Sequence, residues 1–147
     1  MESLPPIEHS VYINSPVDKV FTTLTTSEGW DGWFTRGALV DLDKSFIRFV
    51  WKDWGPDRID AEDGGEIVSY EPYREFTFRW YVSGHSTTVQ FLVDPQGKGT
   101  RLTVLEHGYK ATEKDALKMI GCATGWGEAV TLLKFYLEHG VVYGEVG

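Results

Sequence analysis

Hydrophobic and polar positions alternate along most of the chain up to residue 107, and a period of two is typical of strands that bury one face. The alternation predicts seven strands, over residues 7–13, 38–41, 46–51, 66–70, 75–81, 85–94 and 100–107. One face of the last three strands is apolar throughout, in the rows Phe76, Phe78 and Trp80; Val89, Phe91 and Val93; and Leu102 and Val104. We therefore expect an antiparallel sheet with this face turned to the core.

Two short helices are expected between the first strand and the second. Ser15 can cap the first helix, and Pro16 suits its first helical position. Apolar side chains then repeat at helical spacing as far as Leu24. Residues 25–27 interrupt this pattern, and the second helix is expected to carry three aromatic side chains: Trp30, Trp33 and Phe34.

The segment from residue 53 to residue 65 is acidic and contains the turn signals Gly55-Pro56 and Gly64-Gly65, so we expect a loop there. Its carboxylates lack the spacing of a calcium-binding loop. We interpret them as a solvated face: Asp53, Asp57, Asp60, Glu62 and Asp63.

One long helix is predicted over residues 113–139, where Thr112 can cap the start and Asp115 stands three residues further on. Apolar side chains recur in it at steps of three and four: Met119, Ala123, Trp126, Val130, Leu133 and Leu137. At ~1.5 Å per residue this helix is about 40 Å long and crosses a domain of this size. We expect it to lie along the concave face of the sheet. The predicted fold is thus α+β, a curved antiparallel sheet of about six to seven strands around a long C-terminal helix, with residues 1–147 as one domain.

Five stretches of the sequence carry a resemblance to a known family. They are the run from Ile7 through Ser15-Pro16 to Thr25; Trp30-x-x-Trp33-Phe34; Gly64-Gly65 with Ile67, Pro72, Arg74, Phe78 and Trp80; Gly99-Thr100 with Leu102, Val104 and Gly108; and Gly125-Trp126 with Val130 and Leu133. The chain resembles the START-like superfamily, which has the helix-grip fold of the birch-pollen allergen. Within it, the chain is similar to the family homologous to the activator of heat-shock protein 90 ATPase.

This resemblance implies a hydrophobic cavity, which members use for lipid or polyketide binding, for cyclisation or for contact with a chaperone. A chaperone is thereby an alternative partner, with a role in the stress response. The chaperone activators themselves carry an additional N-terminal domain that is not recognised in this sequence. We therefore expect this domain alone not to stimulate a chaperone ATPase.

Composition adds an unusual aromatic content to this picture, with six Trp, seven Tyr and eight Phe. That content suits a ring-walled cavity or a filled core equally. The net charge is −8 and no cluster of Lys and Arg is visible in the sequence, so nucleic acid and anionic membranes are not expected partners. Cys122 is the only cysteine, the first 13 residues do not resemble a signal peptide, and no apolar run approaches ~20 residues. We expect a soluble, cytoplasmic protein.

No catalytic motif is recognised, and neither a cofactor nor a metal is expected. The histidines are scattered, and there is no second cysteine for a zinc site. Strand parity places Glu106 with the inward row, where its carboxylate would face the pocket, or at the strand end, where it would meet water. His85 shares the inward parity and also follows a turn, so it too has two interpretations. Cys122 is interpreted as a small core residue.

Three glycines in the long helix, Gly121, Gly125 and Gly127, cost roughly 1 kcal/mol each against alanine. They indicate either a close approach of the helix to the sheet or an opening into the interior. We favour close packing around Trp126.

The leading hypothesis is the non-catalytic binding of a small apolar or aromatic molecule between the sheet and the long helix. The expected pocket residues are Trp30, Trp33, Phe34, Phe49, Trp51, Phe78, Trp80, His85, Val89, Phe91, Val104, Glu106, Met119, Ala123, Trp126 and Val130. The first alternative is a protein-interaction module of the chaperone-activator type. The second is a cyclase or hydrolase that uses the same cavity and needs Glu106 or His85 buried and paired.

Overall fold

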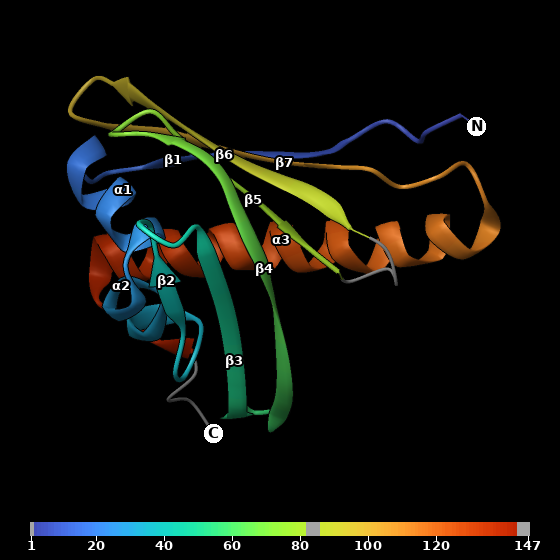
Figure 1. Ribbon diagram of the computed structural model, residues 1–147. Coiled ribbons are helices and arrows are strands. Elements are labelled where there is room, and N and C mark those ends of the chain that lie inside the picture. The colour runs from blue at the N-terminus through green and yellow to red at the C-terminus, as the bar shows by residue number, and fades with distance from the viewer. Residues whose placement is uncertain (1, 82–85, 144–147) are drawn as a thin grey trace.

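The computed structural model describes residues 2–81 and 86–143 (Figure 1). The elements follow in the order β1 (Ile7–Ile13), α1 (Val17–Thr25), α2 (Ser27–Trp33), β2 (Leu39–Asp41), β3 (Phe46–Trp54), β4 (Ile59–Glu71), β5 (Glu75–Trp80), β6 (Thr87–Gln96), β7 (Gly99–His107) and α3 (Glu113–His139). The predicted α+β fold is confirmed, with two short helices after the first strand and one long helix after the last. None of the helices described here has the length and hydropathy that a membrane crossing requires.

The strands form one antiparallel sheet in the order β1-β7-β6-β5-β4-β3-β2. The first strand pairs with the last, with Ile7 opposite Glu106. The sheet curves around α3, while α1 and α2 lie near one end of this helix (Figure 1). All eight side chains expected on the inward face of β5, β6 and β7 are buried, which confirms the predicted alternation.

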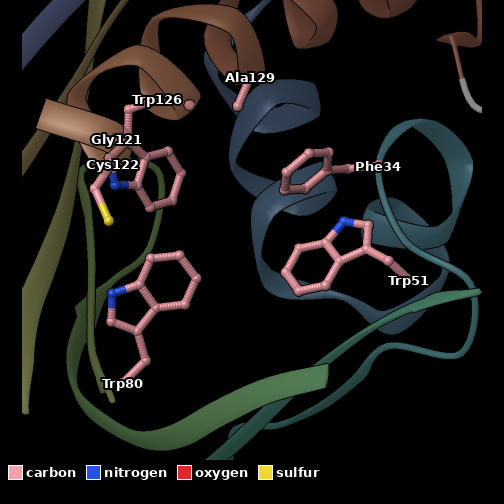
Figure 2. Close-up of a pocket in the computed structure, with 8 residues that line it drawn as sticks. Phe34, Trp51, Trp80, Gly121, Cys122, Trp126 and Ala129 are labelled. Atoms are coloured by element: carbon pink, nitrogen blue, oxygen red, sulfur yellow. The ribbon is translucent and has the colours of Figure 1, made fainter. Parts of the chain in front are cut away.

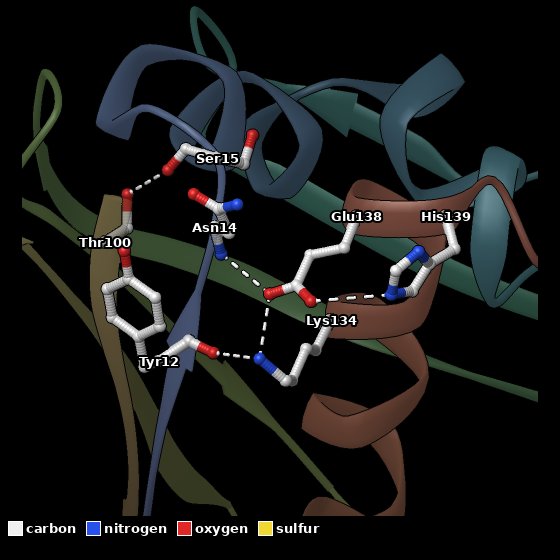
Figure 3. A network of polar contacts seen from close by, with 7 residues as sticks. All are labelled: Tyr12, Asn14, Ser15, Thr100, Lys134, Glu138 and His139. Atoms are coloured by element: carbon white, nitrogen blue, oxygen red, sulfur yellow. Dashed lines mark hydrogen bonds and ion pairs between the residues drawn. The ribbon is translucent and has the colours of Figure 1, made fainter. Parts of the chain in front are cut away.

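Polar contacts tie the C-terminal half of α3 to β1 (Figure 3). The Lys134 ammonium donates to the carbonyl oxygen of Tyr12 at 2.6 Å and to the carboxylate of Glu138 at 2.8 Å. The same Glu138 oxygen accepts the backbone N–H of Asn14 at 2.7 Å. These bonds fix the helix against an edge strand of the sheet.

Both ends of α3 are capped. At the start, the Thr112 hydroxyl accepts the backbone N–H of Asp115 at 3.2 Å, as the sequence predicts. At the end, Gly140 adopts a left-handed conformation with φ 69°, and its N–H donates to the carbonyl of Tyr136 at 2.9 Å. Glycine pays no steric penalty there.

The predicted loop over residues 53–65 is wrong, because most of it belongs to the β3–β4 hairpin. The turn itself occupies residues 55–58. Asp63 pairs with Phe49, and the flanking charges lie on the exposed surface, where Arg48 forms an ion pair with Glu62 at 2.7 Å. A side chain at Gly64 or Gly65 would collide with the backbone of the adjacent strand. These glycines therefore allow close strand approach in the sheet instead of forming a turn.

The predicted cap of α1 is also wrong. Pro16 occupies the N-cap position, and no side chain caps this helix. Ser15 is buried, and its carbonyl oxygen accepts the hydroxyl of Thr100 at 2.7 Å (Figure 3). The residue that sequence reasoning assigned to capping thus joins the start of α1 to β7.

Candidate ligand-binding site

A pocket of about 260 Å³ lies between α3, the end of α2, β3 and the end of β5 (Figure 2). Every side chain that lines it is apolar or small: Phe34, Trp51, Trp80, Gly121, Cys122, Gly125, Trp126 and Ala129. Concave, mostly apolar hollows of this kind are the usual sites for small molecules.

Two aromatic pairs face each other across this pocket (Figure 2). Trp80, the last residue of β5, lies 5.4 Å from Trp126 of α3 between ring centroids, at an interplanar angle of 35°. On the other side, Phe34 at the end of α2 meets Trp51 of β3 edge-on, with centroids 5.3 Å apart. Four rings from four elements thus surround the space.

The wall supplied by α3 is thin at two glycines. Gly121 and Gly125 are exposed, and a Cβ built on either would meet no atom within 4 Å. Gly127 differs, because its Cβ would lie 3.2 Å from the ring of His9. The expected close packing is therefore confirmed at Gly127 and wrong at the other two, which leave an opening beside the pocket.

A buried carboxylate holds the two tryptophans of the pocket in place. Glu106 is fully buried near the end of β7, and its Oε1 accepts the indole N–H of Trp126 at 2.9 Å. Its Oε2 accepts the indole N–H of Trp80 at 2.9 Å and the hydroxyl of Thr87 at 2.6 Å. The solvated interpretation of Glu106 is therefore wrong. Its side chain points inward as expected, but it lies behind the indoles and is not among the residues that line the pocket.

The polar groups beside Glu106 are Tyr109, Cys122 and Asp63. Burial raises the pKa of the Tyr109 hydroxyl, and the nearby thiol of Cys122 and the charge of Glu106 add to the rise. This buried hydroxyl makes no hydrogen bond with any residue in the described part of the chain. Burial also raises the pKa of Cys122, with further contributions from the negative charges of Glu106 and Asp63. The thiol at the pocket wall is therefore protonated at neutral pH.

Asp63 is half-buried on β4, and its pKa is raised as well. Burial is the main cause, and the charge of Glu106 adds to it. Hydrogen bonds from the backbone N–H groups of Gly64 and Tyr81 oppose the rise. The carboxyl groups of Asp63 and Glu106 thus lie within electrostatic reach of each other.

The structure brings four of the expected pocket residues together as lining, namely Phe34, Trp51, Trp80 and Trp126. Eight others belong to the packed core: Trp30, Trp33, Phe49, Phe78, Val89, Phe91, Val104 and Val130. Trp33 stacks on Phe34 with centroids 4.8 Å apart, while Met119 and Ala123 are partly buried and pack against the core from α3. Glu106 lies behind the indoles, and His85 lies outside the described residues.

Sequence reasoning did not place Gly121, Cys122, Gly125 and Ala129 at the pocket, although the structure does. A signal was present, because residues 122, 125 and 129 are small and recur at helical spacing. The apolar stripe through Met119 and Ala123 lies on a neighbouring face of the same helix.

The comparisons with known proteins agree with this architecture. A family model described as Activator of Hsp90 ATPase homolog 1-like protein matches residues 14–138. The chain belongs to this family. The match contains every residue that lines the pocket, and it confirms the resemblance drawn from the sequence motifs. A comparison with curated proteins returned no match.

Solved structures share the fold at low sequence identity. DynU16, from the dynemicin biosynthetic locus, is 21% identical with a TM-score of 0.77, and the match covers 93% of this chain and 48% of that one. Protein SSP2350 from Staphylococcus saprophyticus is 21% identical with a TM-score of 0.75, and 97% of each chain is covered. The Aha1 dimer from Colwellia psychrerythraea is 20% identical with a TM-score of 0.73, covering 93% of this chain and 98% of that one. This chain therefore spans about half the length of DynU16 and nearly all of the other two.

Proposed function

We propose that this member of the family binds one small apolar or aromatic molecule in the pocket and does so without catalysis. The observation that carries the proposal is a space of about 260 Å³ walled by four aromatic rings, beside open space at Gly121 and Gly125 of the covering helix. Small-molecule pockets commonly measure ~300–1,000 Å³, so the expected ligand is a small one.

The position of Glu106 supports binding over catalysis. Both carboxylate oxygens are engaged by indole and hydroxyl donors, and the tryptophan rings stand between this group and the pocket. A general acid or base must reach its substrate directly or through one water molecule. A relative from a biosynthetic locus further favours a small organic molecule as the ligand.

The direct test is native mass spectrometry of the protein purified from its own cells, with Ala129→Leu as a matched variant. Ala129 is buried and lines the pocket, so the larger side chain would occupy the binding space. We expect a small-molecule adduct on the wild-type chain and none on the variant. Equal adducts on both chains, or none on either, would contradict binding in this pocket.

A second candidate is a protein-interaction module of the chaperone-activator type, with a chaperone as partner and a role in the stress response. Membership in the family favours it, as do Leu117 and Ile120, which are each 64% exposed on α3. We expect this chain alone to leave the ATPase rate of a cognate chaperone unchanged. Stimulation of the chaperone ATPase by stoichiometric amounts of this chain would favour the interaction module over the binding of a small molecule.

A further inference from the structure

A buried carboxyl group that accepts hydrogen bonds on both oxygens lies directly behind the aromatic wall of the pocket. Trp80 and Trp126 present their rings to the space and donate their indole N–H groups to the same buried carboxylate, that of Glu106. All three donors to this group within the described residues are neutral. No ion pair joins it to a lysine, arginine or histidine of residues 2–81 or 86–143. Within the described residues, neutral donors alone therefore hydrogen-bond this carboxylate.

An indole that donates its N–H to an anion carries more electron density on its ring face, because hydrogen-bonded groups polarise one another. Tryptophan is already the aromatic side chain that attracts cations best. A positive group in the pocket would also feel the charge of Glu106 through side chains of low polarity, where screening by water is weak. Both effects strengthen the binding of a cation, and neither strengthens the binding of a neutral molecule.

The other charged groups near the pocket also favour a positively charged ligand. Asp63 and Glu106 both act on the thiol of Cys122, which lines the space. Lys118 is the one described cation that acts on this thiol, and its side chain is exposed to solvent. The whole chain carries a net charge of −8. At this thiol, the charges of Glu106 and Asp63 therefore each act more strongly than that of Lys118.

We propose that the pocket selects an organic cation, in which a protonated amine or quaternary ammonium group is attached to an apolar body. The charged group lies against the faces of Trp80 and Trp126, and the apolar body fills the space toward Phe34 and Trp51. A hydrated metal ion does not fit, because the lining offers no oxygen ligand to replace its water. This inference rests on the proposed function, since it names the chemical class of the ligand for the same pocket.

The test uses two probes of nearly equal shape, phenyltrimethylammonium and tert-butylbenzene, which differ in charge. Each competes with an apolar fluorescent reporter for the folded wild-type protein. We expect the cation to bind roughly tenfold more tightly, the factor that corresponds to a moderate cation–π attraction in a desolvated site. A neutral probe that binds as tightly as the cation overturns this inference and leaves the proposed function intact. If neither probe nor the reporter binds, both this inference and the proposed function are overturned.

Variants separate the charge of Glu106 from its role in holding the rings. In Glu106→Gln we expect the affinity for the cation to fall about tenfold while that for the neutral probe stays within about twofold. Glu128→Gln, which removes an exposed carboxylate from α3, is the matched control and should change neither affinity. Equal losses for both probes in Glu106→Gln would show that the carboxylate only positions the rings, and would overturn the inference.

A second variant keeps the test decisive if Glu106→Gln does not fold. Trp126→Phe retains a ring at the pocket and removes the N–H that meets Glu106. We expect it to weaken the cation at least roughly threefold more than the neutral probe, because phenylalanine attracts cations less strongly than tryptophan. An unchanged preference in this variant would contradict the assignment of the charged group to these indoles.

Discussion

The orientation of Trp80 and Trp126 depends on one acceptor. A buried carboxylate costs several kcal/mol in desolvation unless hydrogen bonds compensate for the loss of water. Glu106 recovers this cost through two indole N–H groups and the hydroxyl of Thr87. The same bonds fix the direction in which both rings face. A residue outside the pocket lining therefore determines the shape of the pocket.

The glycines of α3 also act at the scale of single residues. Alanine is favoured over glycine by ~1 kcal/mol in a helix interior, provided that its methyl group meets no neighbour. Gly121 and Gly125 satisfy that condition. We expect Gly121→Ala and Gly125→Ala each to raise the free energy of unfolding by about 1 kcal/mol, measured by chemical denaturation.

Gly127→Ala is the matched control for these two variants. Its methyl group would lie 3.2 Å from the ring of His9, so packing strain offsets the gain in helix propensity. The ring is further held by the bond between its Nε2 and the Ala123 carbonyl oxygen, 2.8 Å apart. A gain at Gly127 equal to that at the other two positions would show that the three sites do not differ in space.

At the scale of elements, two segments of α3 have different tasks. The last turns are fixed to β1 through Lys134 and Glu138, whereas the middle of the helix, residues 121–129, carries the glycines and lines the pocket. The C-terminal end of the helix thus provides anchorage, and its middle leaves room for a ligand.

The anchorage predicts a dependence of stability on pH. The backbone N–H of Asn14 and, next, the ammonium of Lys134 hold the pKa of Glu138 below its ordinary value near 4.5. A lowered pKa in the folded state stabilises the fold above the unfolded pKa, and this stability is lost as the pH falls through the folded pKa. We expect Glu138→Gln to lower the free energy of unfolding by about 1–2 kcal/mol at pH 7.

The difference between Glu138→Gln and the wild type should shrink as the pH is lowered below about 4.5, and denaturation curves from pH 7 to pH 3 would measure it. Glu128→Gln on the exposed face of α3 serves as the control, with an expected change within ~0.5 kcal/mol at every pH. A constant deficit across this range would contradict an electrostatic role of Glu138.

The face that α3 turns to the pocket predicts contrasting effects of two alanine substitutions. Ala129→Leu adds three carbons to the open space, so we expect a change in stability below about 1 kcal/mol and a loss of probe binding. Ala123 packs against the core beside His9, so Ala123→Leu should cost roughly 1–3 kcal/mol and retain binding. Thermal midpoint and probe affinity, measured on the same samples, check both. The reverse outcome would move the pocket to the Ala123 face.

At the scale of the whole molecule, periodicity was sufficient to predict the sheet, the long helix and the inward rows, because burial of one face imposes a period on the sequence. It failed at residues 53–65, where the exposed end of a hairpin needs no apolar side chains and two glycines serve close strand approach. A sequence rich in charged residues and glycines is the same whether the segment forms a loop or an exposed strand.

The site was less predictable than the fold for a physical reason. An empty space leaves no signal in the sequence, because the rings that line the pocket follow the same alternation of apolar and polar residues as the rings of the filled core. Phe78 and Trp80 share one inward row, yet only Trp80 lines the pocket. The partners of Glu106 come from β5, β6 and α3, and sequence parity could place this carboxylate inward without identifying them.

The central claim is that the folded protein contains an open apolar site between the aromatic pairs. The most direct measurement is a titration with an apolar, environment-sensitive fluorophore, with near-ultraviolet circular dichroism recorded on the same samples. We predict saturable binding of one fluorophore per chain while the dichroism spectrum remains that of the native state. Fluorescence that rises only as the native spectrum is lost would contradict the claim, since it would show that the interior opens to a ligand only on unfolding.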